Sequence, residues 1–84
     1  MDAAIMAADP RAKLGKAIGR RLMERRERLE LNRLRTAQAA GITWANLQLY
    51  EQGRKVPDVA TLIKLAGALG LSVGRLLQGI EREI

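Results

Sequence analysis

The segment that decides the fold runs from Leu31 to Gly53 and has the sequence Leu-Asn-Arg-Leu-Arg-Thr-Ala-Gln-Ala-Ala-Gly-Ile-Thr-Trp-Ala-Asn-Leu-Gln-Leu-Tyr-Glu-Gln-Gly. Asn32 and Thr43 are typical helix N-caps, because their side-chain oxygens accept hydrogen bonds from the free N–H groups of a first turn. Gly41 tolerates a positive φ and can end the first helix. Two short helices joined by a glycine-containing turn, over about residues 33–52, are the arrangement of a helix-turn-helix.

The composition excludes several classes of function. The 84 residues suffice for one domain and contain neither cysteine nor histidine, which removes disulfides, thiolate metal sites and the commonest catalytic base. Carboxylates are not clustered either, so we expect no catalytic residue, no metal site, no cofactor and no enzyme activity. The chain lacks both an apolar run of about 18 to 20 residues and a basic N-terminal signal region, so we expect a cytoplasmic protein.

The charge favours a polyanionic partner, either nucleic acid or an acidic membrane surface. The net charge is +6, and ten of the fifteen lysines and arginines lie between Arg11 and Arg35. The helix expected there has an apolar stripe of Leu, Ile and Ala without Trp or Phe, which disfavours a membrane partner. Trp44 and Tyr50 are the only aromatic residues, too few for a sheet-based RNA-stacking surface.

The remaining segments also predict helices and no strand. Residues 1–8 are expected to form a flexible arm, and Asp9-Pro10 should start a helix that ends at about Arg28. Asp58 should cap a helix over residues 59–69, and Ser72 a short helix through Leu77. We therefore expect an all-α fold with about five helices, a domain over residues 9–79 and a C-terminal tail over residues 80–84.

The helix expected over residues 59–69 leaves little room for a polar face, so it should be central to the core. Its apolar residues are Val59, Leu62, Ile63, Leu65, Ala66 and Leu69.

An ordered set of residues carries a resemblance to a known family. They are Leu31-Asn32, Ala37, Gly41-Ile42-Thr43, Leu47, Glu51 and Gly53, Pro57, the run from Leu65 to Val73, and Leu76-Leu77. From about Leu14 to Leu77 the chain resembles the lambdoid phage repressor and Cro family, also called the XRE family of helix-turn-helix regulators. The resemblance implies a five-helix lambda-repressor-like domain that binds double-stranded DNA.

The resemblance also implies the residues of a DNA interface. Leu47 and Tyr50 should face inward at an i, i+3 spacing, which turns the other side of their helix outward. In the family, outward residues near the start of this helix enter the major groove. The implied base-reading residues are Trp44, Ala45, Gln48 and Leu49. The implied phosphate contacts are Asn32, Arg33, Thr43, Asn46, Arg54 and Lys55.

One further pair has a structural role in the family. An arginine late in the first helix often joins the glutamate that ends the recognition helix, and these positions are Arg26 and Glu51 here. We favour a pair that fixes the angle between the two helices over two exposed charges that happen to align. If the pair is buried, removing one partner should cost about 3–5 kcal/mol.

The recognition face departs from the family pattern. Many relatives carry glutamine where this chain has Trp44, Ala45, Leu49 and Arg33. Glutamine hydrogen-bonds adenine, whereas alanine and leucine only contact a thymine methyl group or fit the shape of the groove. Two alternatives therefore stay open: this apolar face binds a protein partner, or Trp44 packs into the core.

The leading hypothesis is a dimeric repressor that occludes a pseudo-palindromic operator, since each monomer would read only one half-site. The expected dimer contacts are Leu77, Ile80 and Ile84, whereas Leu76 is expected to close the monomer core. The alternative is a protein-interaction module on the same fold, such as an antiactivator or an antitoxin-like partner.

Overall fold

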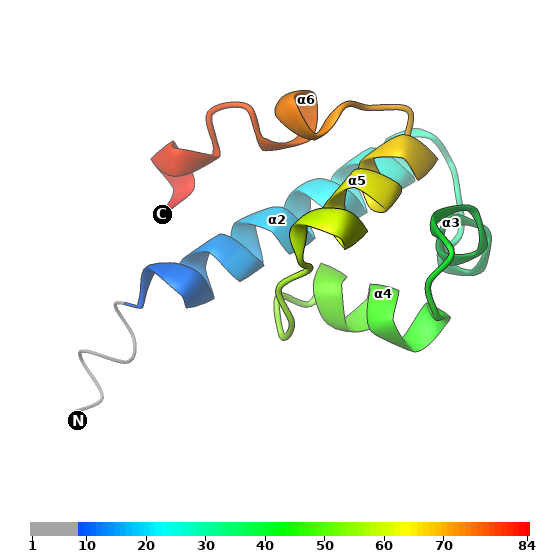
Figure 1. The fold of residues 1–84 in the computed structure, drawn as a ribbon, viewed down its shortest axis with the longest axis horizontal. Coiled ribbons are helices and arrows are strands. Elements are labelled where there is room, and N and C mark those ends of the chain that lie inside the picture. The colour runs from blue at the N-terminus through cyan, green and yellow to red at the C-terminus, as the bar shows by residue number, and fades with distance from the viewer. Residues whose placement is uncertain (1–8) are drawn as a thin grey trace.

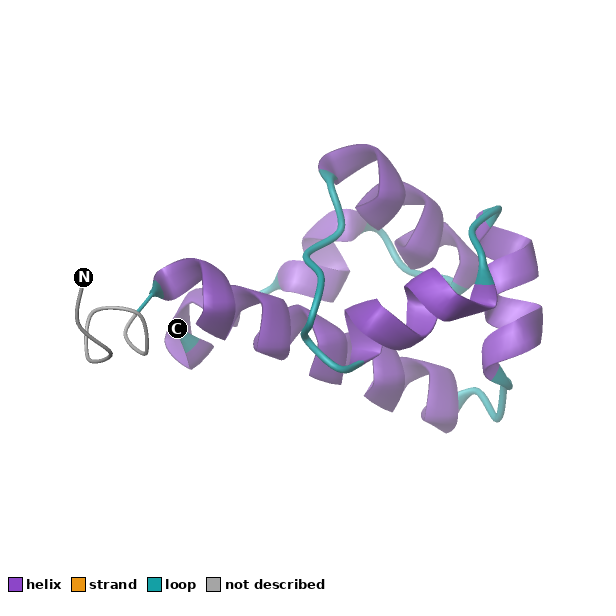
Figure 2. Cartoon of the chain, turned by 90° about the horizontal axis from the view of Figure 1, so that it is seen from below, coloured by secondary structure: helices purple, strands orange, loops and turns teal. Residues whose placement is uncertain are grey.

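The computed structural model describes residues 9–84, so the arm predicted for residues 1–8 lies outside the described residues. Figures 1 and 2 show helices and connecting loops, and no strand is present within residues 9–84. The elements are α2 (Pro10–Arg28), α3 (Arg33–Ala40), α4 (Trp44–Glu51), α5 (Val59–Ala68), α6 (Val73–Leu77) and the 3-10 helix η1 (Ile80–Glu83). The predicted all-α fold with five α-helices is confirmed for the described part of the chain.

The predicted N-caps of four helices are confirmed. Each capping side chain accepts a hydrogen bond of 2.7–3.1 Å from the backbone N–H three residues later. The caps are Asn32 for α3, Thr43 for α4, Asp58 for α5 and Ser72 for α6. The hydrogen bond from the Thr61 N–H also lowers the pKa of the Asp58 carboxyl, because it stabilises the carboxylate. Short-range sequence chemistry therefore sets where these helices begin.

The core lies between α2, α3, α4 and α5, where α2 packs on α4 and α3 packs on both α4 and α5. It contains Ala17, Ile18, Leu22, Ala37, Ala40, Leu47, Tyr50, Leu62, Leu65, Ala66, Leu69, Leu76 and Ile80. The helix α5 contributes Leu62, Leu65 and Ala66 to the core. Two of the apolar residues that we expected to leave it little polar face lie outside the core, since Val59 is 70% exposed and Ile63 is 57% exposed. These two lie four residues apart, on the side of α5 opposite to Leu65, and no described element covers them.

The C-terminal segment is part of the folded domain rather than the tail that we expected. Ile80 is buried at 8% exposure in the core. Glu83 accepts a hydrogen bond of 2.8 Å from Arg21 Nε and another of 3.1 Å from Arg20 Nη1. These contacts dock η1 on α2 and leave Ile80, one of the predicted dimer contacts, in the core of the monomer. Leu76 closes the monomer core, as expected, at 3% exposure.

Candidate nucleic-acid interface

The outer face of α4 is the first component of the site. Leu47 and Tyr50 are buried, as predicted from their spacing, while Trp44 is 46% exposed and Ala45 is exposed. Gln48 and Leu49 on the same helix are half-buried. The alternative in which Trp44 packs into the core is therefore wrong, because nearly half of its surface meets solvent. The four predicted base-reading residues keep accessible surface on one short helix.

A glycine on α2 sets how closely α4 packs, and it was not among the predicted site residues. A Cβ atom built on Gly19 would lie 2.3 Å from the Tyr50 carbonyl oxygen and 2.8 Å from that of Glu51. No side chain fits at that separation, so the backbones of α2 and α4 approach directly. The available sequence signal was the i, i+4 spacing of Gly15 and Gly19 on the buried face of α2.

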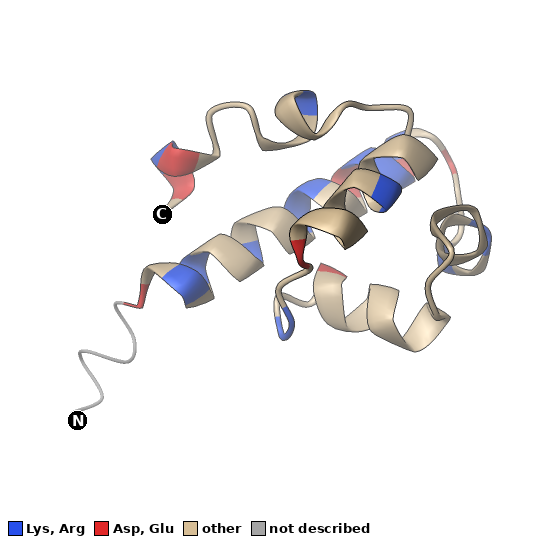
Figure 3. Ribbon diagram, in the orientation of Figure 1, with Lys and Arg blue, Asp and Glu red and all other residues tan. Residues whose placement is uncertain are grey.

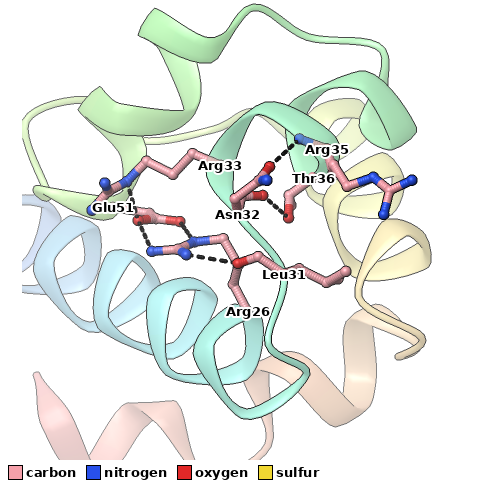
Figure 4. Close-up of polar contacts among 7 residues, drawn as sticks. All are labelled: Arg26, Leu31, Asn32, Arg33, Arg35, Thr36 and Glu51. Atoms are coloured by element: carbon pink, nitrogen blue, oxygen red, sulfur yellow. Dashed lines mark hydrogen bonds and ion pairs between the residues drawn. The ribbon is translucent and has the colours of Figure 1, made fainter.

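The predicted ion pair exists and has a third member (Figure 4). Arg26 donates from Nε to Glu51 Oε2 at 2.7 Å and from Nη2 to Glu51 Oε1 at 3.1 Å. Arg33 donates from Nε to the same Oε1 at 2.9 Å. The Glu51 side chain is only 2% exposed, and its hydrogen bonds raise the pKa of Arg26. The pair thus joins α2 to the last residue of the recognition helix.

The same cluster orients the start of α3. Arg26 Nη1 donates to the Leu31 carbonyl oxygen at 2.9 Å, and Asn32 caps the helix by accepting from the Arg35 N–H at 2.8 Å (Figure 4). Arg33 is also part of this cluster, because its Nε is paired with Glu51. At the same time 37% of the Arg33 side chain is exposed to solvent.

The loop after α4 brings two further predicted residues together. Lys55 Nζ donates to Asn46 Oδ1 at 3.3 Å and lies 5.8 Å from the centre of the Tyr50 ring. Arg54 is exposed beside it, and Gly53 turns the chain there with a φ of +72°. The loop thus places the Lys55 ammonium group beside Asn46 and Tyr50 of the recognition helix, with Arg54 following the C-terminal end of that helix.

Charge surrounds α4 without lying on it. The only charged residue within α4 is Glu51, which is buried, whereas blue segments mark α3 and the loop after α4 in Figure 3.

Within residues 9–84 no group of acidic side chains could hold a metal ion. In that part of the chain no single helix is long and apolar enough to cross a membrane, though α5 with the segment from Val73 to Glu83 meets that test as a bent pair.

Known proteins match this chain in sequence and in fold. A family model described as "Helix-turn-helix" matches residues 22–76. The chain is 34% identical over 68 residues to the HTH-type transcriptional regulator PuuR of Escherichia coli (strain K12) and of Shigella flexneri. These matches cover 81% of this chain and 37% of each relative, so the chain spans just over a third of the length of the curated relatives it matches.

Solved structures agree with the sequence matches. The clp gene regulator ClgR of Corynebacterium glutamicum superposes with a TM-score of 0.74 at 30% identity, covering 76% of this chain and 68% of that one. The apo form of the competence regulator ComR of Streptococcus vestibularis gives a TM-score of 0.73 at 28% identity, covering 79% and 22%. Both the family and the fold expected from the sequence are confirmed. The chain belongs to the XRE family of helix-turn-helix transcriptional regulators.

Proposed function

We propose that this chain binds a specific operator as a dimer and represses transcription by occluding the promoter. The observation that carries the proposal is the exposed, uncharged face of α4, which is fixed to α2 by Gly19 and Glu51 and flanked by cations from α3 and the following loop. A rigid neutral helix between cations suits a major groove between two phosphate backbones. The regulators that match the chain support the same class of function.

The proposed base-reading contacts differ in what they recognise. Gln48 has both a donor and an acceptor and can pair with adenine, a contact that contributes about 1–3 kcal/mol of discrimination. Trp44, Ala45 and Leu49 offer apolar surface, which suits thymine methyl groups and the local shape of the groove. The operator should therefore be rich in A·T pairs under α4.

The proposed phosphate contacts use groups that keep hydrogen-bonding capacity. Thr43 Oγ1 accepts from the Asn46 N–H, which leaves its hydroxyl proton for a phosphate oxygen. Asn46 accepts from Lys55 through Oδ1, which leaves its amide protons. The remaining contacts are the exposed cap Asn32 and the cations Arg33, Arg54 and Lys55.

For the dimer, the structure leaves two of the three predicted residues with accessible surface. Ile84 is 43% exposed and Leu77 is half-buried, whereas Ile80 is buried within the monomer. We propose that Leu77 and Ile84 meet their symmetry mates and place two α4 helices about 34 Å apart, one helical turn of DNA.

A second candidate function uses the same face. The 46% exposure of Trp44, with Ala45 and Leu49 beside it, also suits a protein-interaction surface. An antiactivator or antitoxin-like partner would cover this patch instead of DNA.

Selection of bound fragments from the native genome, followed by binding measurements at two salt concentrations, separates these candidates. A DNA reader should enrich one pseudo-palindromic site and lose orders of magnitude in affinity between about 50 and 200 mM salt, because cations on the protein displace condensed counterions. Recovery of unrelated fragments with no shared motif would favour the protein-interaction module.

A further inference from the structure

A second basic surface lies away from α4. A shallow pocket of about 180 Å³ opens between the C-terminal half of α2 and α6. Figure 1 shows α6 and α4 on opposite sides of α2, so this pocket does not face the proposed DNA. Its charged lining is Arg21, Glu24, Arg25, Arg28 and Arg75. Four arginines and one glutamate give the lining a net charge of +3.

Two of these arginines are held in place by the fold. Arg21 donates to the Leu76 carbonyl oxygen at 3.0 Å and, through Nε, to Glu83 at 2.8 Å, so its charge is already compensated. Arg25 donates only through Nε, to the Leu69 carbonyl oxygen at 3.0 Å. This bond orients the Arg25 guanidinium toward the pocket while both of its Nη atoms keep their protons for another acceptor.

The other two arginines converge from different helices. No hydrogen bond or ion pair formed within residues 9–84 involves the guanidinium groups of Arg28 on α2 or Arg75 on α6. Cations in the last turn of α2 interact favourably with the helix dipole, which accounts for Arg25 and Arg28. Arg75 likewise lies in the last turn of its own helix, α6, and lines the same pocket from the opposite side to α2.

We propose that this pocket binds an acidic segment of a partner protein. Carboxylates of the segment would pair with Arg25, Arg28 and Arg75, since guanidinium groups bind carboxylates through two parallel hydrogen bonds. The apolar part of the lining, Leu71 and Leu76, would receive an aliphatic side chain. A DNA backbone suits the pocket less well, because its deoxyribose rings offer less apolar surface to the two leucines than an aliphatic side chain does. A partner bound here would leave α4 free to engage DNA.

The test uses the 84-residue chain and a fluorescent peptide of alternating Glu and Leu, with a matched peptide in which Gln replaces Glu. Binding is measured by fluorescence anisotropy, and its location by amide chemical-shift changes. We expect only the acidic peptide to bind, with shifts around α6 and the last turns of α2. Arg28→Ala combined with Arg75→Ala should weaken binding at least about fivefold, since two charge-assisted contacts are lost.

The matched control is Arg11→Ala combined with Lys13→Ala, which removes two positive charges from the exposed first turns of α2. It should change affinity by less than about twofold, because those charges are screened from the pocket. Equal weakening by both pairs, or equal binding of the Gln peptide, would overturn the proposal. So would displacement of the peptide by random duplex DNA with shifts at α6, which would assign the pocket to DNA. The proposal is independent of operator binding, since Trp44→Ala should leave peptide affinity unchanged.

Discussion

Glu51 is the only charged residue of α4, and both of its carboxylate oxygens accept hydrogen bonds from arginines. Burial of a carboxylate carries a large desolvation penalty, which well-oriented hydrogen bonds to two arginines largely offset. The pair therefore mainly fixes the position of α4, because the last turn of that helix cannot rotate without breaking these bonds. The Arg26–Glu51 pair was predicted as a structural pair, and Arg33 joins it while 37% of its side chain stays exposed.

Replacement of Arg26 by Ala should lower the free energy of unfolding by about 3–5 kcal/mol, since Glu51 would lose its most buried partner. Arg33→Ala should cost about 1 kcal/mol or less, because that side chain is 37% exposed. Urea denaturation measures both, and Glu81→Ala, at an exposed residue, serves as the control. Equal costs for Arg26→Ala and Glu81→Ala would show that the buried pair does not hold the helices together.

The raised pKa of Arg26 fixes the sign of the pH dependence. A cation with a raised folded pKa stabilises the fold fully below its unfolded pKa and loses that contribution only as the pH rises through the folded value. The pKa of an arginine in the unfolded chain is already far above this range and folding raises it further, so the Arg26 contribution should stay constant between pH 6 and about pH 10. Denaturation midpoints of the native protein and Arg26→Ala across that range should differ by a constant amount. If the difference between the two denaturation midpoints disappeared by pH 9, the stabilisation could not come from the Arg26 cation.

The contact between α2 and α4 depends on the absence of a side chain at Gly19. Alanine there would favour helix formation by about 1 kcal/mol, yet its Cβ would collide with the Tyr50 carbonyl oxygen. We expect Gly19→Ala to destabilise the protein by about 1–3 kcal/mol overall. Gly67→Ala is the matched control, because a Cβ at Gly67 meets nothing within 4 Å. In thermal unfolding, Gly19→Ala should lower the midpoint temperature and Gly67→Ala should raise it. A higher midpoint temperature for Gly19→Ala would disprove the close approach of α2 and α4.

The end of α2 offers a stabilising substitution. Glu30 adopts a φ of +56°, and the Leu31 N–H donates to the Arg26 carbonyl oxygen, which is the bonding of a Schellman cap. Glycine occupies the equivalent left-handed position after α4 and after α5, as Gly53 and Gly70. Glu30→Gly should therefore stabilise the protein by about 0.5–1 kcal/mol. Chemical denaturation tests this, with Glu27→Gly inside α2 expected to destabilise by about 1 kcal/mol.

Short-range sequence signals predicted where the helices begin and end more successfully than how the helices pack on one another. Caps such as Asn32 and Thr43 act within three residues, so the sequence around them suffices to predict them. The docking of η1 depends on Glu83 meeting Arg21, 62 residues earlier, and no short-range pattern indicates that contact. Similarly, Val59 and Ile63 are exposed because no described element packs over that side of α5. The hydrophobicity of the two residues does not reveal this. The α4 site residues came from the family resemblance. For Gly19 the sequence offered its i, i+4 spacing with Gly15, but the helix crossing was needed to show what the missing side chain allows.

Within residues 9–84, Figure 3 shows blue segments on α3 and in the loop after α4, and a further one on α6, on the other side of α2 from α4. Arg54→Ala combined with Lys55→Ala should weaken binding to all duplexes about equally and reduce the salt slope by about 0.9 for each lost phosphate contact. Arg75→Ala, on the far side, should leave duplex affinity within about twofold. Affinity titrations at several salt concentrations check both. An unchanged salt slope in the double variant would remove these two residues from the interface.

The most direct test concerns the apolar face of α4 itself. The quantity to measure is the ratio of affinities for the genome-selected operator and a scrambled duplex, at one salt concentration, for the native protein and for Trp44→Ala combined with Leu49→Ala. If α4 reads bases through these side chains, the ratio should fall at least about tenfold, while affinity for the scrambled duplex stays nearly constant. An unchanged ratio would contradict base recognition by this face.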